Sequence, residues 1–297
     1  MEWTPPSRRP DKEMKWTPKT PQGKCYSLPV GERTIIMGIL NVSPDSFSGD
    51  GVSARDEALA RGEKLIRDGA DIIDVGGQST RPGAEQISAE EEIERTAPVI
   101  KELAAGFDVP VSIDTYKSAV AEKAFLSGAA ILNDISGLRF DERMAPLAAE
   151  FNVPVVLMHI RGTPENMQKG GIFYEDVIES IKVYLKKSIE IAVGAGIPQG
   201  MIIIDPGIGF GKTVEHNLVI LKRLKELGEL GKPVLIGTSR KSVIGEVLNL
   251  PAGERLEGTA ATVAVAIANG ADIVRVHDVK EMKRVAVMTD AIMRVKR

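Results

Sequence analysis

The sequence predicts an α/β fold, a (β/α)8 TIM barrel, from three observations. Eight apolar, β-branched runs of strand length follow one another, and amphipathic stretches separate most of them. The runs are apolar at nearly every residue, as expected of a parallel sheet buried on both faces. Eight such units in about 260 residues match the usual length of a (β/α)8 barrel.

Each expected strand is rich in Ile, Val, Leu or Met and is bounded by turn-forming residues. The eight strands are expected at residues 34–42, 70–77, 109–115, 129–136, 153–160, 201–207, 233–239 and 271–278. Between them, apolar residues recur at the spacing of a helix face. The clearest helices are expected at residues 54–69, 88–106, 174–196 and 254–270. In the second of these, Ser88 precedes Glu91 by three residues, which is typical of a helix N-terminus.

A doubly wound open sheet is the alternative fold. That fold needs a glycine-rich phosphate-binding turn after its first strand, and "ILNVSPDSF" at 39–47 lacks one. A weak internal repeat at 68–74, 127–134 and 269–278 instead indicates short connections from helix to strand.

The first 24 residues differ from the rest because they contain five prolines. We interpret residues 1–24 as a disordered or loosely docked N-terminal tail and residues 25–297 as a single barrel domain. Residues 25–38 are expected to form an N-terminal β-hairpin, with its turn at Gly31, that leads into the barrel.

The composition is that of a globular protein, with 43% hydrophobic and 27% charged residues. A net charge of −3 and a pI near 5.8 argue against nucleic-acid binding. The single cysteine, Cys25, excludes an intramolecular disulfide. No apolar run reaches the roughly 18 residues of a membrane-spanning helix, and the N-terminus lacks a signal-peptide core. We therefore expect a cytoplasmic protein that does not bind membranes.

The stretch "DPGIGFGKT", residues 205–213, resembles a phosphate-binding P-loop at first sight. A P-loop needs four residues between its first glycine and the Gly-Lys-Thr. That glycine position is occupied by Pro206, which has no N–H to donate. The spacing therefore excludes a nucleotide cradle.

In a barrel of this type the active site lies at the carboxyl ends of the strands. Nearly every expected strand carries a polar group there. These are Asn41, the segment Gly76–Arg81 with Ser79 and Thr80, Asp114, Asn133, His159, Asp205, Ser239 to Lys241, and Arg275 with His277. Turn residues alone do not require Arg, Lys and His to converge, so we interpret this rim as a functional site.

The rim combines two chemistries. Asn41, Arg81, Arg275 and His277 suit phosphate or a metal–phosphate group. Because no acidic cluster is present, we expect Mg²⁺ carried mainly by substrate phosphates. Asp114, Asn133 and Asp205 suit a planar heterocycle with adjacent N–H donors, and Lys241 suits the carbonyl group of that ring.

Eight strings carry a family resemblance, in order from about Ile35 to His277. They are "MGILNVSPDSFSGDG", "DVGGQSTRPGA", "SIDTYK", "ILNDISG", "MHIRGTPENMQ", "DPGIGFGKT", "GTSRKS" and "RVHD". Together they resemble the dihydropteroate synthases of folate biosynthesis. The resemblance implies a transferase that joins 4-aminobenzoate to dihydropterin-CH₂-diphosphate, releases diphosphate and acts as a homodimer.

The resemblance also implies a role for each matching residue. It implies that Asp114, Asn133, Asp205 and Lys241 hold the pterin. It implies that Asn41, Arg81, Arg275 and His277 hold diphosphate, with Asn41 on Mg²⁺. It implies that Thr80, Pro82, Phe210, Ser239 and Lys241 line the aminobenzoate site. The expected catalytic residues are Arg81, Lys241, Arg275 and His277.

Two departures and two rival functions accompany this assignment. Gln78 stands where many relatives have Glu, and Ser43 where many have Thr.

One rival is a pterin-dependent methyltransferase, which would have no diphosphate to bind. The other is a catalytically silent pterin-binding paralogue, against which Arg81, Lys241, Arg275 and His277 argue.

Overall fold

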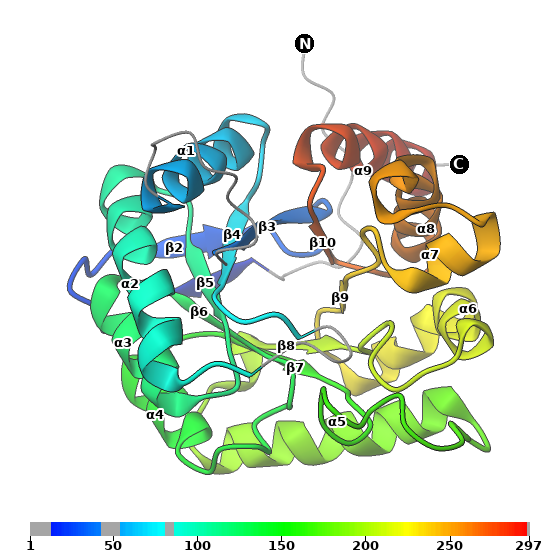
Figure 1. Ribbon diagram of the computed structural model, residues 1–297, viewed down its shortest axis with the longest axis horizontal. Helices are drawn as coiled ribbons and strands as arrows, with labels where there is room; N and C mark the ends of the chain where they lie inside the picture. Colours follow the sequence, from blue (N-terminus) through cyan, green and yellow to red (C-terminus); the bar gives the residue numbers. More distant parts are fainter. Residues whose placement is uncertain (1–12, 43–53, 81–85, 296–297) are drawn as a thin grey trace.

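The computed structural model describes residues 13–42, 54–80 and 86–295. They form a ring of parallel strands surrounded by helices, shown in Figure 1. The predicted fold class is therefore confirmed. The barrel strands are β3 (Ile35–Asn41), β4 (Ile72–Gly76), β5 (Val111–Asp114), β6 (Ile131–Asp134), β7 (Val155–Met158), β8 (Ile202–Asp205), β9 (Leu235–Ile236) and β10 (Ile273–Val276).

The helices follow the strands in chain order and cover the outside of the ring (Figure 1). In the described residues they are α1 (Ala54–Arg67), α2 (Ala89–Gly106), α3 (Ser118–Ser127), α4 (Met144–Phe151), α5 (Val177–Gly194), α6 (Val214–Arg223), α7 (Ser242–Leu248), α8 (Leu256–Ala268) and α9 (Val279–Arg294), with the short 3-10 helices η2 (Gln199–Met201), η3 (Leu224–Leu230) and η4 (Ala252–Glu254). Ser88 caps α2 as expected, because its hydroxyl accepts a hydrogen bond from the Glu91 N–H.

The eight strands close into a barrel. Their order in space is β8-β7-β6-β5-β4-β3-β10-β9. The last strand, β10, therefore pairs with the first, β3, on one side and with β9 on the other. The two outermost strands of this order are joined by a parallel bridge between Ile204 and Val234. The Ile204 N–H also donates to the Pro233 carbonyl at 2.9 Å. The open-sheet alternative is therefore wrong.

The barrel interior is apolar toward the amino ends of the strands and polar toward their carboxyl ends. Ile35 and Met37 of β3 belong to the interior cluster, whereas Ile36 belongs to the cluster that packs against the helices. This is the two-residue alternation of a strand. Above the apolar layers, β4 and β10 contribute Asp74 and Arg275 to the interior. The polar layer places the candidate site at the carboxyl end.

An N-terminal hairpin is present, but it uses a different strand from the one expected. Strand β2 (Tyr26–Leu28) pairs antiparallel with β1 (Met14–Trp16), not with the chain beyond Gly31. Trp16 is buried, and its indole N–H donates to the Ala130 carbonyl at 2.9 Å. Residues 13–24 are thus not a loose tail, because two apolar side chains of β1 extend the interior cluster. Residues 1–12 lie outside the described part of the chain.

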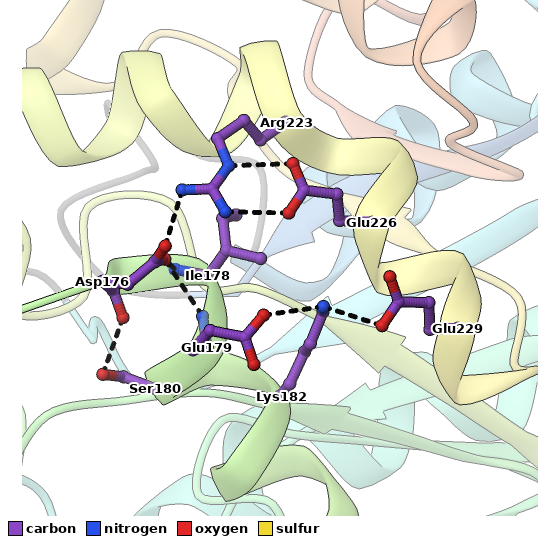
Figure 2. Close-up of polar contacts among 8 residues, drawn as sticks. All are labelled: Asp176, Ile178, Glu179, Ser180, Lys182, Arg223, Glu226 and Glu229. Atoms are coloured by element: carbon purple, nitrogen blue, oxygen red, sulfur yellow. Dashed lines mark hydrogen bonds and ion pairs between the residues drawn. The ribbon is translucent and has the colours of Figure 1, made fainter.

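A network of charged residues links α5 to the chain after α6 (Figure 2). Asp176 caps α5 and accepts from Arg223 at 2.8 Å. Arg223 donates two further hydrogen bonds to Glu226, and Lys182 pairs with Glu229. Lys182 is buried, whereas its carboxylate partners are exposed, and Arg223 and its partners are half-buried. The network supports the outer layer and contributes no group to the rim.

Across the described residues, none of the helices combines the length and the hydropathy needed to cross a membrane.

Candidate active site

Four neighbouring strands carry a level row of residues at their carboxyl ends. In the sheet register, Asn41 is level with Gly76, Gly76 with Asp114, and Asp114 with Asn133. A Cβ atom at Gly76 would lie 3.8 Å from Asn41 Oδ1 and 3.6 Å from Asp114 Cβ. Gly76 thus leaves room between the two side chains. The row brings together three of the residues predicted from the sequence.

Arg275 of β10 reaches the carboxylates of β4 and β5. Its Nε donates to Asp74 Oδ2 at 2.6 Å, and a terminal nitrogen donates to Asp114 Oδ2 at 2.6 Å. Burial lowers the pKa of Arg275, but the charges of Asp74 and Asp114 outweigh burial and raise it. The guanidinium therefore stays charged. Asn133 Nδ2 donates to the same Asp74 oxygen at 3.0 Å.

Asp74 is a residue that the strand-end analysis missed. It lies in the middle of β4, and its side chain is fully buried. The signal in the sequence was a carboxylate between Ile73 and Val75 in an otherwise apolar strand. Burying a carboxylate is costly unless it is paired. An acidic residue in mid-strand is therefore as informative as one at the end of a strand.

Asp114 of β5 and Asp205 of β8 are carboxyl groups with little exposure: the Asp114 side chain is 13% exposed and Asp205 is 7% exposed. Burial raises the pKa of Asp114 to about 7 against the lowering effect of Arg275. Asp114 Oδ1 has no hydrogen-bond partner among the described residues. Burial also raises the pKa of Asp205, and Lys241 opposes this rise. Both groups offer acceptor oxygens to a ligand that supplies N–H donors.

Lys241 and Phe210 form the wall next to Asp205. The Lys241 Nζ lies 4.7 Å from the centroid of the Phe210 ring and donates to the Ile208 carbonyl. Burial lowers the pKa of Lys241 to about 8, although the Asp205 charge acts in the opposite direction. The Lys241 ammonium group thus lies over the Phe210 ring and close enough to Asp205 for the carboxylate charge to act on it.

The turn after β8 depends on glycine. The Gly207 N–H donates to Asp205 Oδ1 at 2.7 Å, which holds the carboxylate at the rim. Gly207 has a φ of +69°, and a Cβ atom there would lie 2.0 Å from the His159 carbonyl oxygen. Only glycine fits this position.

Lys212 of the Gly-Lys-Thr sequence supports the same turn. It is buried, and its Nζ donates to the carbonyls of Gly207 at 2.8 Å and Phe210 at 3.0 Å. It also lies 2.8 Å from His159 Nδ1. Burial lowers the pKa of His159 to about 2, so this imidazole is neutral. His159 therefore belongs to the support of the loop, and Lys212 is engaged by the protein itself.

His277 and Ser239 are paired at the ends of β10 and β9. His277 Nδ1 lies 3.0 Å from Ser239 Oγ, and the His277 N–H donates to the same oxygen at 3.2 Å. Ser239 is buried. His277 also lines a cavity that includes Asn41. Asn41 and His277, two of the predicted diphosphate residues, thus line one cavity together with residues of α1 and α9.

The segment after β4 is described only in part. Thr80 is half-buried, whereas Arg81 and Pro82 lie outside the described residues. Gln78 Nε2 donates to the Tyr116 hydroxyl at 2.8 Å, and its Oε1 accepts from Lys117 at 2.7 Å. Gln78 uses its amide as both donor and acceptor, which a glutamate at this position would not do when ionised.

A permanent protein-held metal site is not found in the described residues. No group of three or more His, Cys, Asp or Glu side chains there could hold an ion. Asn41 offers one amide oxygen at the exposed end of β3. This donor set fits Mg²⁺ that is held mainly by phosphate oxygens and water.

Known proteins resemble this chain over most of its length. The family model for pterin binding enzymes matches residues 37–277. Dihydropteroate synthase of Clostridium beijerinckii is 53% identical over 267 residues, 89% of this chain and 96% of that protein. Dihydropteroate synthase of Bacillus subtilis is 50% identical over 271 residues, 91% of this chain and 92% of that protein.

Two solved structures show the same fold. Dihydropteroate synthase from Clostridium difficile, determined with pteroic acid, has a TM-score of 0.85 at 48% identity and covers 90% of this chain and 100% of that chain. Dihydropteroate synthase from Xanthomonas albilineans, determined with 4-aminobenzoic acid, has a TM-score of 0.87 at 38% identity and covers 96% of this chain and 100% of that chain. The chain therefore belongs to the pterin-binding enzyme family and, within it, to the dihydropteroate synthases.

Proposed function

We propose that this enzyme joins 4-aminobenzoate to the CH₂ group of (7,8-dihydropterin-6-yl)methyl diphosphate in folate biosynthesis. The products are 7,8-dihydropteroate and diphosphate. One observation carries the proposal beyond the family assignment. Arg275, a cation suited to phosphate, contacts Asp114, an acceptor suited to a heterocycle, at 2.6 Å. The two halves of such a substrate would therefore meet at this contact.

The pterin is assigned to the buried acceptors and Lys241. Asp205 would accept from the amino-pyrimidinone edge, because its carboxylate is fixed by the Gly207 N–H. Asp114 and Asn133 would accept further ring N–H donors on the other side of the barrel. Lys241 would donate to the ring carbonyl. The raised pKa of Asp114 and Asp205 supports this assignment, since ligand N–H donors would relieve their desolvation.

The diphosphate is assigned to Asn41, Arg275 and His277, with Arg81 from the segment outside the described residues. The rim fits Mg²⁺ held by the substrate, with Asn41 as the protein ligand. When bound, Mg²⁺ stabilises negative charge on the leaving diphosphate. Arg275 and His277 act on the same charge through hydrogen bonds. The aminobenzoate is assigned to Thr80, Pro82, Phe210, Ser239 and Lys241.

The proposed reaction is a displacement in which the leaving group departs first. The C–O bond breaks and its electron pair leaves with diphosphate. The aminobenzoate nitrogen then attacks the CH₂ carbon, and the amine loses a proton to water. Among the described rim residues no imidazole is placed as a general base. His159 is neutral and engaged by Lys212, and His277 is paired with Ser239.

A homodimer is proposed as the assembled state, with the α8–α9 face as its contact. Val265 of α8 and Val287, Met288 and Ile292 of α9 are large apolar side chains between 46% and 62% exposed. The last two are four residues apart, so they lie on the same face of the helix. Ile292→Asp is expected to shift the protein from dimer to monomer in analytical ultracentrifugation. A cytoplasmic location and the absence of nucleic-acid and membrane partners are proposed from composition.

Turnover with both substrates tests the function. Release of diphosphate that depends on 4-aminobenzoate, together with formation of dihydropteroate, is the expected result. A methyltransferase would release no diphosphate, and a silent paralogue would bind the pterin without turnover. Either result would contradict the proposal.

A further inference from the structure

Asp74 occupies a layer of the barrel that usually holds apolar side chains. Interior layers of such barrels are dominated by branched apolar residues, and β4 has Ile72 in the layer below. Asp74 is level with Ser112 of β5 and is fully buried. Its Oδ1 has no hydrogen-bond partner among the described residues. A carboxylate kept there at a cost to stability requires a reason other than folding.

The other oxygen of Asp74 makes two contacts at once. Oδ2 accepts from Arg275 Nε at 2.6 Å and from Asn133 Nδ2 at 3.0 Å. These donors come from β10 and β6, on either side of β4. One atom therefore fixes the side chains of a residue assigned to diphosphate and a residue assigned to the pterin.

The contact with Asn133 sets the orientation of its amide. Because the NH₂ group of Asn133 is used by Asp74, its carbonyl oxygen is directed away from Asp74 as an acceptor. Without this contact the amide would be free to rotate and present either end. Asp74 thus determines that Asn133 meets a ligand N–H donor.

The contact with Arg275 sets the position of its guanidinium. Asp74 holds Nε and Asp114 holds one terminal nitrogen. Neither of these contacts uses the second terminal nitrogen of Arg275. Two carboxylates on neighbouring strands thereby orient the fork and leave a donor for an anion.

We propose that Asp74 is a positioning residue that holds the pterin half and the diphosphate half of the site in register through one carboxylate oxygen. The proposal rests on the proposed function for the identity of the ligands. Asp74 acts through Asn133 and Arg275 rather than on the reacting atoms. A misplacement of about 1 Å in such groups is enough to lower a rate by roughly 100-fold.

A positioning role of Asp74 can be distinguished from a purely structural role, because Arg275 keeps its ion pair with Asp114 when the Asp74 side chain is removed. Asp74 and Asp114 both form ion pairs with Arg275. Replacing Asp74 by a neutral residue leaves the one-to-one pair of Arg275 and Asp114. The melting temperature is therefore expected to stay near the native value while function is lost.

The test compares Asp74→Ala and Asp74→Asn with Asp290→Asn. The Asp74→Asn variant retains an amide oxygen that can accept from both Arg275 and Asn133, whereas the Asp74→Ala variant retains neither contact. Asp290 is a matched buried carboxylate that accepts from the Thr34 N–H and from Arg294, outside the site. Calorimetry with 6-hydroxymethylpterin alone and with inorganic diphosphate plus Mg²⁺ reports each half separately, and kcat reports the assembled site.

Asp74→Ala is expected to lower kcat by roughly 100-fold and to weaken both probes, and Asp74→Asn to restore most of each loss. Asp290→Asn is expected to lower the melting temperature and leave kcat and both affinities unchanged. Native affinity for either probe in Asp74→Ala, or equal losses in the alanine and asparagine variants, would overturn the proposal. If Asp74→Ala does not fold, Asp74→Ser replaces it in the same measurements, because the serine side chain is too short to reach both Arg275 and Asn133. An inactive native enzyme would refute the proposed function alone, because the two binding measurements would still test Asp74.

Discussion

The Nδ1 atom of His277 lies 3.0 Å from the Oγ atom of Ser239. Ser239 was expected to line the aminobenzoate site, yet its hydroxyl also accepts from the His277 N–H. One hydroxyl therefore fixes both the backbone and the ring of a residue assigned to diphosphate. This contact would join the proposed leaving-group end of the site to the proposed aminobenzoate end.

Ser239→Ala is expected to weaken the binding of diphosphate with Mg²⁺ between about twofold and tenfold, because a net hydrogen bond contributes about 0.5–1.5 kcal/mol. Calorimetry with inorganic diphosphate measures this change. Thr262→Ala, which removes a hydroxyl that donates to Thr238 Oγ1 behind β9, is the control and should not alter it. If Ser239→Ala raised only the KM for aminobenzoate and left diphosphate binding unchanged, Ser239 would not act through His277.

Asp205→Asn is expected to weaken binding of the pterin diphosphate at least tenfold. The substitution replaces an acceptor by a donor that would face a ligand donor, and an unmet buried hydrogen bond costs about 1–3 kcal/mol. Calorimetry measures the affinity. Asp272→Asn serves as a control, since that buried carboxylate accepts from the Val234 N–H, away from the rim. Equal weakening in both variants would indicate a general loss of structure.

The activity is expected to fall as the pH rises through about 8. Burial lowers the pKa of Lys241 to about 8, so the ammonium group loses its proton there and becomes a weaker donor to the pterin carbonyl. The plot of kcat/KM against pH reports groups of the free enzyme. Lys241→Gln should lower kcat/KM and remove this alkaline limb. A limb that persists in the variant would have to be assigned to another group.

The stability of the empty enzyme should change in the opposite direction over the same range. The pKa of Lys241 is lower in the folded protein than its ordinary value of 10.5, so the unfolded chain binds more protons between these values. Lys241 therefore contributes an increase in the free energy of unfolding as the pH rises from about 8 toward 10.5. Urea titrations of the native protein and of Lys241→Gln isolate this contribution as a difference.

A clearly normal secondary isotope effect is expected when the CH₂ group of the pterin substrate carries deuterium. A leaving group that departs first produces a planar, cation-like carbon, stabilised by the pterin carboxylates. The measurement requires conditions in which chemistry limits the rate. A value near unity would indicate direct in-line attack and would require a general base that the proposed mechanism does not include.

Trp16→Ala is expected to lower the free energy of unfolding by about 3–5 kcal/mol, the usual cost of truncating a large buried side chain. Trp16 is buried and donates to the Ala130 carbonyl. Lys15→Ala in the same strand is the control, because the Lys15 side chain is 63% exposed. If both variants unfolded at the same urea concentration, β1 would not contribute to the core.

Most of the fold was predictable because each barrel strand is an apolar run that its own residues define. The hairpin was not, since Met14, Lys15 and Trp16 lie among prolines and are too few to show alternation. β1 is held by its pairing with β2, by the burial of Met14 and Trp16 in the interior cluster and by the hydrogen bond from Trp16 to Ala130, which no local pattern predicts. Long-range packing here outweighed local composition.

The same distinction applies to the site. The proximity of Asn41, Asp114 and Asn133 was predictable because they lie at or next to the carboxyl ends of strands that the register places side by side. The direction of the Asn133 amide was not predictable, because its NH₂ group donates to Asp74 of β4, two strands away in the sheet. His159 ends a strand as expected but is used by Lys212 to support a loop. Position along a strand predicts proximity to the rim, and only tertiary contacts decide which atom faces a ligand.

The pairing of β10, the last barrel strand, with β3, the first, affects how the chain folds during synthesis. Ile273 of β10 is paired with Ile35 of β3. One edge of β3, the first barrel strand, therefore stays uncovered until β10, the last barrel strand, has been synthesised. Until then β3 exposes unpaired backbone groups and apolar side chains, which is a hazard for aggregation. Contacts between residues so distant in sequence also slow folding. The ribosome would have to release nearly the whole chain before the barrel could close.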